Sequence, residues 1–462
     1  MKRIRVRWLL AVFSLVSFYI MMTLNYDSDF QFTSLLPLTY FFVLVFILRD
    51  DIIADGLGAG ALTYFYAFRM CILPLICAFG NFYIEPDKND YIQYYNWGIL
   101  LISIECVIVF CSLRYFTNFF IKKGKRVLKV ETTQSNHELI KWVVGLLTIT
   151  IIFLQAGLNV NYYTPITLQA EEIIMYELGE TSKGAWWYIN DLLSTWWRPL
   201  ITIYLIYSIL QRKIEHPYLW IVLIAGLNIY FMSDRRIYAL LVGGYALYYA
   251  MSVTKSVIVK RFISLFLLSG VFTTLFWGFY TSATADLEMM ARTFQHYFSG
   301  PTLNALSLRV FDIIGVKPID FVYLLLNDFQ TFTALYKTIE LPNYFDPLFG
   351  YSQGLWVPMT VGSLRYFGIF FPIVLIFFVY YIKQCDFWAK HSSSSIYSMI
   401  YYYIGVCVSC YMVMYTVELI CYFIIVTGSL YRALIYFDQR MSFSNNKIII
   451  NKHEGASSCK QR

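Results

Sequence analysis

Residues 95–113, YNWGILLISIECVIVFCSL, determine the fold class of this chain, together with the basic stretch directly after them, residues 114–126, RYFTNFFIKKGKR. The first stretch carries a single charge, Glu105, over the length of about 20 residues that a helix needs to cross a hydrocarbon core of about 30 Å. The second stretch is rich in Lys and Arg, which gather on the cytoplasmic side of membrane helices. Together they predict a membrane helix that ends in the cytoplasm.

The whole chain has the same character. Its 462 residues are 58% hydrophobic and 14% charged, with a mean hydropathy of +0.56, which excludes a water-soluble globular domain. Backbone groups in lipid must be paired within their own segment, so helices are expected. The sequence predicts an all-α, polytopic integral membrane protein with about twelve membrane helices. The predicted segments are 8–25, 33–48, 58–82, 95–113, 139–158, 193–211, 218–232, 236–253, 262–281, 355–382, 394–413 and 417–436.

The distribution of Lys and Arg over the short connections sets the orientation. These residues gather at the N-terminus, in residues 114–129 and in the tail from Arg440 to Arg462. We therefore expect a single membrane domain over 1–462 with both termini in the cytoplasm. It would have a first outer loop at 159–192, a large extracytoplasmic loop at 281–355 with short interfacial helices, and a cytoplasmic polar tail at 437–462. The net charge of +7 is then a result of topology and does not indicate nucleic-acid binding.

Motifs for metals and nucleotides are missing from the sequence. There is no Walker-type phosphate loop, no HExxH, and the five His are isolated from one another. None of the nine Cys lies in either predicted outer loop, so a disulfide framework is not expected. We expect no metal and no cofactor.

Charges inside predicted membrane helices are costly and therefore informative. Arg69 and Glu105 lie near the middle of neighbouring antiparallel segments, at matching depth. We expect them to form a structural ion pair, because either charge alone would cost more than the pair; a role in a pathway or substrate site is the alternative. Arg365 lies about a third of the way into the tenth segment from the outer face, where it is a candidate to reach an anionic head group.

A short outer turn, Ser233-Asp234-Arg235-Arg236, opens directly into the predicted eighth helix. Two guanidiniums beside a helix N-terminus form an anion site, because Arg offers forked donors and the helix end adds positive potential. Alternatively, Asp234 caps the helix and the arginines bind lipid head groups.

The early part of the large loop, Arg292 to Pro301, reads RTFQHYFSGP. It contains His296, the only His on the outer side in the predicted topology, and His exchanges protons near neutral pH. His296 is therefore a candidate base. The alternative is a hydrogen-bonding surface residue.

These stretches resemble motifs of the oligosaccharide repeat-unit polymerases, the O-antigen polymerases of Wzy type, and more distantly the O-antigen ligases. Residues 233–241, SDRRIYALL, resemble the family's small residue and Arg before an apolar helix. Residues 297–301, YFSGP, are similar to the start of its large outer loop. Residues 354–364, GLWVPMTVGSL, with Gly368 and Pro372 after them, resemble the loop's exit. The motifs fall within residues 220–380, and the layout of the whole chain agrees.

The resemblance implies a metal-independent and nucleotide-sugar-independent enzyme in the bacterial cytoplasmic (inner) membrane. Such an enzyme transfers a growing glycan from undecaprenyl pyrophosphate to the non-reducing end of another lipid-linked unit. Arg235 and Arg236 would bind the pyrophosphate and act in catalysis, with Arg292 and Arg365 as further contacts, because preorganised cations stabilise a departing diphosphate. Association with a chain-length regulator is a further expectation, besides membrane lipids.

One departure from the family pattern concerns the base. Related enzymes often have a His near the loop's exit, where this chain has residues 349–354, FGYSQG. Either His296 replaces it, or a carboxylate such as Asp346 or Glu340 does.

Other classes of function stay open. A lipid-linked oligosaccharide flippase also has about twelve helices and basic inner loops, but it needs two similar halves, and no internal repeat is found here. An O-antigen ligase shares the Arg chemistry. A non-enzymatic assembly partner is the remaining alternative.

Overall fold

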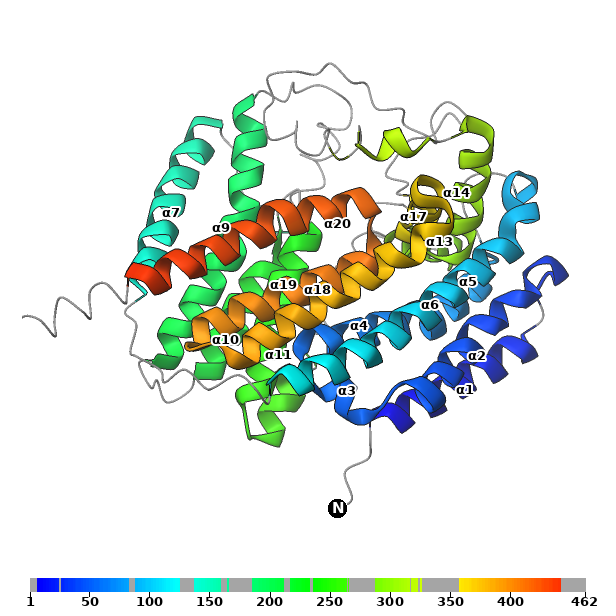
Figure 1. Ribbon diagram of the computed structural model, residues 1–462, viewed down its shortest axis with the longest axis horizontal. Helices are drawn as coiled ribbons and strands as arrows, with labels where there is room; N and C mark the ends of the chain where they lie inside the picture. The colour runs from blue at the N-terminus through cyan, green and yellow to red at the C-terminus, as the bar shows by residue number, and fades with distance from the viewer. Residues whose placement is uncertain are drawn as a thin grey trace, which may run out of the picture. The chain divides into compact units, whose positions relative to one another are not determined.

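The computed structural model is predominantly helical (Figure 1). It describes residues 6–24, 26–82, 88–124, 137–158, 164–165, 185–211, 217–232, 236–263, 265, 287–315, 317–322, 325 and 357–441. By their contacts the residues form two compact units: unit 1 is Met1–Val127, Phe272–Lys390 and Tyr401–Phe423, and unit 2 is Leu128–Val271, His391–Ile400 and Ile424–Arg462. Each unit is described by itself.

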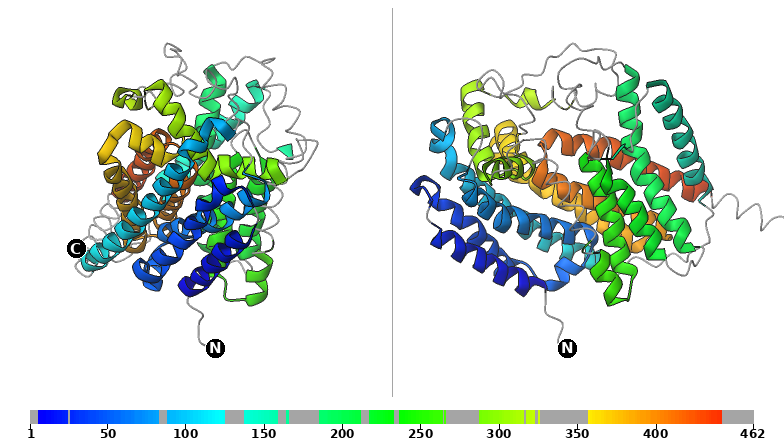
Figure 2. Two further views of the ribbon diagram at one scale, coloured as in Figure 1. Left: turned by 90° about the vertical axis from the view of Figure 1, so that its right-hand side faces the viewer. Right: turned by 180° about the vertical axis from the view of Figure 1, so that it is seen from behind.

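The helices of the first unit's long N-terminal segment come in chain order. They are α1 (Val6–Thr23), the 3-10 turn η1 (Ser28–Ser34), α2 (Leu35–Phe42), the π-helical turn η2 (Val43–Ile47), α3 (Asp50–Ala54), α4 (Leu57–Ala67), the π-helical turn η3 (Phe68–Ile72), α5 (Leu73–Phe79) and α6 (Lys88–Gly124). Within unit 1, α1 lies beside α2, as the views of Figure 2 also show.

The remaining elements come after α6 in the chain. They are α7 (Glu138–Leu158), β1 (Thr164–Pro165), α9 (Ala185–Gln211), α10 (Pro217–Tyr230), β2 (Phe231–Met232), α11 (Arg236–Val253), α13 (Leu287–Tyr297), α14 (Pro301–Ile314), α17 (Met359–Phe367), the 3-10 turn η4 (Gly368–Phe370), α18 (Phe371–His391), α19 (Ser395–Met414), α20 (Val417–Phe423) and the π-helical turn η5 (Ile424–Gly428). In unit 2, α7 packs against α9 and α10 against α11.

Seven helical stretches in the described part of the chain are long and apolar enough to cross a membrane, which is consistent with a helical membrane protein. They are Val6–Thr23, Ser28–Ile47, Leu57–Phe79, Tyr91–Gly124, Met359–His391, Ser395–Met414 and Val417–Met441. Helices α7, α9, α10 and α11 occupy four further predicted segments, and the predicted segment 262–281 lies mostly outside the described residues. The number of twelve membrane helices stays a prediction.

Several boundaries differ from those predicted. Helix α6 has 37 residues, a length of about 55 Å, so it is longer than the predicted span 95–113 and longer than a hydrocarbon core is thick. The predicted tenth helix is broken after α17, because Gly368 has a φ of 55°, which favours glycine. The last helix continues to Met441, so the first residues assigned to the polar tail are helical.

A short antiparallel ladder is the exception to an all-α fold. β1 pairs with β2 in unit 2, with Thr164 opposite Met232 and Pro165 opposite Phe231. The predicted helix 218–232 therefore ends at Tyr230. Hydrophobic periodicity does not detect strands of two residues.

A buried carboxylate joins α18 to α4 in unit 1. Asp386 accepts hydrogen bonds from the backbone N–H groups of Gly58 (2.9 Å) and Ala59 (3.0 Å), at the start of α4. Lys383, also buried, lies 2.5 Å from a carboxylate oxygen of Asp55 and 3.7 Å from Asp386. The first N–H groups of a helix lack intrahelical partners, so this carboxylate fixes α4 in place.

Candidate functional site

The membrane charges predicted to pair are in contact in unit 1. Arg69 Nη1 lies 2.6 Å from Glu105 Oε1, and the two residues are 1% and 0% exposed. Arg69 lies in the π-helical turn η3, just before Leu73-Pro74. Proline has no N–H to donate to the preceding turn, and widened turns of this kind often accompany functional sites. Arg69 thus extends from this widened turn to contact Glu105 on α6.

Both oxygens of the Glu105 carboxylate accept hydrogen bonds. Tyr66 of α4 donates its hydroxyl to Oε1, which also accepts from Arg69, and Thr360 of α17 donates its hydroxyl to Oε2. Three elements distant in sequence therefore meet at one carboxylate. A buried charge of this kind is tolerated only when paired and hydrogen-bonded.

The Arg69 guanidinium also holds the turn between α13 and α14. Its Nε donates to the backbone carbonyl of Ser299 at 3.2 Å, and Asn304 Nδ2 donates to the same carbonyl at 2.7 Å. Ser299 has a φ of 47°, and Gly300-Pro301 then starts α14 with proline in its first turn. The stretch 297–301, predicted to lie early in the large outer loop, is therefore bound to the buried ion pair.

The predicted large loop begins as packed helices. In unit 1, α13 packs against α5 and α14 against α6. Gly80, directly after α5, is required here, because an added Cβ would lie 2.2 Å from the carbonyl oxygen of Leu287 and 2.5 Å from Ala291 Cβ. Short interfacial helices were expected in the loop 281–355, and most of its second half lies outside the described residues.

Further buried polar atoms lie in unit 1, among them atoms of Arg69 itself and of Asn304, which donates to the Ser299 carbonyl. Five of them have no hydrogen-bond partner among the described residues: Arg69 Nη2, Thr302 Oγ1, Asn304 Oδ1, Ser307 Oγ and Ser363 Oγ. A buried polar atom left unpaired costs about 1–3 kcal/mol, so such atoms are usually matched by water or a ligand.

Arg292 and His296 lie one turn apart on α13, four residues from each other, and so share one face of the helix. Ala291, Phe294 and Gln295, at other positions around α13, are buried. Burial, and then the positive charge of Arg292, lower the pKa of His296 from 6.5 to about 4. His296 is therefore a neutral imidazole at pH 7, able to accept a proton.

Arg365 has partners of its own in unit 1. Its Nη2 donates to a carboxylate oxygen of Asp312 and, at 3.0 Å, to the carbonyl of Leu308, both on α14. Arg365 thus ties α17 to α14, and it binds a carboxylate where a head-group contact was expected.

Arg235 lies outside the described residues. Arg236 begins α11, but its side chain is also outside what the structure describes. The role of these two arginines in binding pyrophosphate therefore stays a prediction. The same holds for the role of Asp346 or Glu340 as the base, because both residues lie outside the described residues.

Sequence patterns do not reveal the residues that hold the ion pair. Tyr66 and Thr360 are buried donors with no local pattern, so only the three-dimensional structure places them beside Glu105. Helix α14 was detectable, because Pro301 and Gly315 mark a helix start and stop, and Gly315 has a φ of 67°.

No protein-family model, no curated protein and no solved structure matches this chain.

Proposed function

We propose that this chain is a membrane glycosyltransferase that polymerises lipid-linked oligosaccharide repeat units of O-antigen or capsule. It would act on the outer face of a bacterial cytoplasmic membrane, with both termini in the cytoplasm. In each step the glycan leaves undecaprenyl pyrophosphate and bonds to a hydroxyl at the non-reducing end of a second lipid-linked unit. Nucleotide sugars and metals take no part in the proposed reaction.

The observation that carries the proposal is the pair Arg292 and His296 on one face of α13. Bond formation releases a proton from the acceptor hydroxyl, and breaking the sugar–phosphate bond places negative charge on the diphosphate. The neutral imidazole of His296 would accept the proton, and the guanidinium of Arg292, one turn away, would stabilise the negative charge on the diphosphate. Because its pKa is about 4, His296 is a weak base, so it takes the proton late, as the new glycosidic bond makes the hydroxyl acidic.

The packing of unit 1 supports the same proposal. Catalytic groups must be held firmly, and α13 is fixed by its contact with Gly80 and by the turn at Ser299 on Arg69.

Deleting the gene in its host, with complementation afterwards, tests the proposal. Gel analysis of the surface polysaccharide should show loss of the ladder while single repeat units still reach the surface. Complementation with the wild-type gene should restore the ladder, and His296→Gln should not. His391→Gln is the matched control and should restore it.

Other outcomes identify the other classes. Lipid-linked units that accumulate without reaching the surface would indicate the flippase. Long polymer that stays on the lipid carrier and is not attached to its final acceptor would indicate the ligase.

The proposed pyrophosphate contact at Arg236 has its own test. Arg236→Lys and Arg236→Ala should each shorten or abolish the ladder, because Lys cannot form the forked contact with phosphate oxygens. A ladder unchanged by both substitutions rejects that residue as part of the site.

A further inference from the structure

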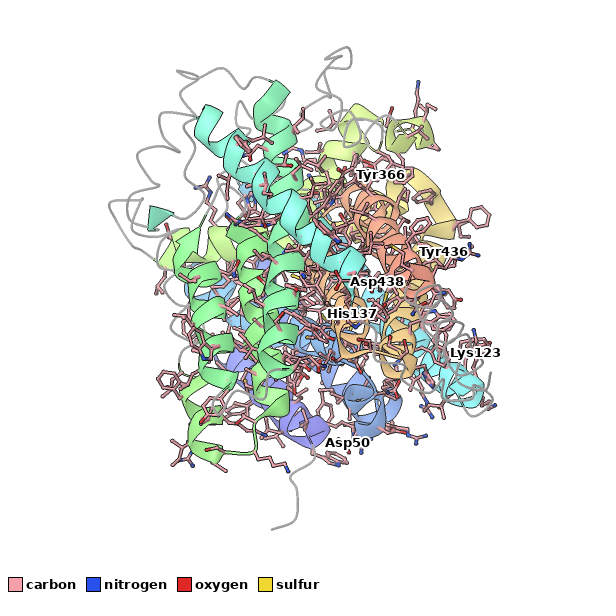
Figure 3. All side chains as sticks on the ribbon, turned by 90° about the vertical axis from the view of Figure 1, so that its left-hand side faces the viewer. Asp50, Lys123, His137, Tyr366, Tyr436 and Asp438 are labelled. Atoms are coloured by element: carbon pink, nitrogen blue, oxygen red, sulfur yellow. The ribbon has the colours of Figure 1, made fainter. Side chains whose placement is uncertain are left out.

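A second cluster of polar side chains lies in unit 2 and contains none of the residues used in the proposed function. His137 Nδ1 is 2.9 Å from Asp438 Oδ2, and His137 Nε2 is 2.8 Å from Ser394 Oγ. His137 and Asp438 are 2% and 1% exposed, and Figure 3 labels both. The three side chains form a continuous chain of hydrogen bonds, Ser394–His137–Asp438.

The hydrogen bonds of Asp438 indicate which ring nitrogen of His137 carries the hydrogen. Asp438 also accepts from the Tyr397 hydroxyl (2.6 Å) and from the backbone N–H of Leu139 (3.1 Å). A carboxylate that accepts from these donors receives the proton of His137 Nδ1–H as well. Nε2 is then the acceptor, and Ser394 donates its hydroxyl to it, which is the arrangement that activates a serine.

Backbone geometry gives independent support. His137 has a φ of 49°, in the left-handed region that non-glycine residues rarely adopt, and such strain persists where a side chain must be held in one place. Ser394 directly precedes α19 and is only partly buried. The first N–H groups of a helix have no intrahelical acceptors, so α19 offers donors beside the hydroxyl for a developing oxyanion.

We propose that Ser394 is an activated nucleophile for carboxylic esters or thioesters, with His137 as its base and Asp438 as a positioning residue. Ser394 Oγ bonds to the acyl carbon while its proton passes to His137 Nε2. The bond from that carbon to the leaving oxygen or sulfur breaks, and the alcohol or thiol departs with the proton. Water then attacks the acyl-serine, the acid is released, and the serine hydroxyl regains a proton.

The three segments also agree in predicted topology. Residues 137, 394 and 438 each adjoin a connection or tail assigned to the cytoplasm from its Lys and Arg content. The acyl group would therefore be presented at the cytoplasmic face. The proposed glycan chemistry is assigned to the outer face, so the two activities stand or fall separately.

Labelling by a fluorophosphonate tests the proposal on the full-length protein in lipid nanodiscs. Serine oxygen attacks phosphorus, fluoride leaves, and the proton goes to His137, so an activated serine gains a stable adduct. Peptide mass spectrometry should find the adduct on Ser394 of the wild-type protein. In a separate sample of unlabelled protein, nitrophenyl acetate should give a burst of one equivalent of nitrophenol.

The variants separate catalysis from structure. His137→Asn should slow labelling about a hundredfold or more, and Asn tolerates the left-handed backbone and can still donate to Asp438. Ser394→Ala should lose the adduct and the burst, while Ser393→Ala, the neighbouring control, should label at the wild-type rate. The proposal is overturned if wild-type Ser394 stays unlabelled while an added serine hydrolase reacts fully, or if His137→Asn labels as fast as wild type.

Discussion

Replacing Glu105 with Gln isolates the charge of the buried pair, because the two side chains have nearly the same shape. In the variant, the Arg69 guanidinium would stay buried without a carboxylate 2.6 Å away. Breaking a buried pair by removing one charge costs about 3–5 kcal/mol. At roughly 2–4 °C per kcal/mol for a unit of this size, the midpoint of thermal unfolding should fall by roughly 6–20 °C.

The assay is thermal unfolding of the purified protein in one detergent, monitored by Trp fluorescence. Glu288→Gln is the matched control, since Glu288 accepts a hydrogen bond from Asn81 at the surface of α13, and it should change stability by no more than about 0.5 kcal/mol. The double substitution Arg69→Met with Glu105→Met should recover only part of the loss: no charge is then buried alone, but the buried hydroxyls of Tyr66 and Thr360 lose their acceptor. A Glu105→Gln midpoint equal to that of the control would refute the buried pair.

Three further outcomes are expected. The wild-type protein should lose stability as pH falls from about 6.5 to about 4, since unfolded His296 takes up a proton before folded His296 does; the shift corresponds to about 3 kcal/mol, and His296→Gln should reduce the fall by that amount. Gly80→Ala should cost about 1–3 kcal/mol, because the new methyl meets the Leu287 carbonyl, whereas Gly145→Ala, which meets nothing, should stabilise α7; equal effects would contradict the packing of α13. Asp386→Ala should cost about 2–5 kcal/mol in the same melting assay, since two backbone N–H groups of α4 lose their acceptor, and an unchanged midpoint would rule out that contact.

Membrane character and the position of the charged residues were predictable from the sequence. The apolar stretch around Glu105 and its match in depth with Arg69 come from hydropathy alone, and the structure places these two side chains in contact. Sequence periodicity did not provide the set of partners. Thr360 is 255 residues from Glu105 along the chain, and no local pattern brings them together.

The early part of the predicted outer loop shows a second limit. The sequence around His296 predicts a loop motif, whereas the structure has two helices, α13 and α14, packed on α5 and α6. Polar residues such as Asn304 and Thr302 reduce the hydropathy of the segment, which is typical of a solvent-exposed loop. Both are nevertheless buried: the side-chain amide of Asn304 donates to the carbonyl of Ser299, and the backbone N–H of Thr302 donates to the side chain of Gln295.

The Ser–His–Asp cluster was undetectable in the sequence for the same reason. Ser394 lies 257 residues from His137, and Asp438 lies 301 residues from it. Each adjoins a predicted helix end, where an isolated polar residue carries no signal. Only the packing of unit 2 brings the three together.

Reconstitution of the purified protein with lipid-linked repeat units, isolated from the deletion strain, tests the proposed polymerase most directly. Each new glycosidic bond should release one undecaprenyl pyrophosphate, so the amount released should equal the number of units added to the glycan. Arg292→Ala and His296→Gln should each stop the release of undecaprenyl pyrophosphate and the growth of the glycan. His391→Gln should leave both unchanged. Units that remain single, with all carrier still bound to sugar in the presence of folded wild-type protein, would contradict the account.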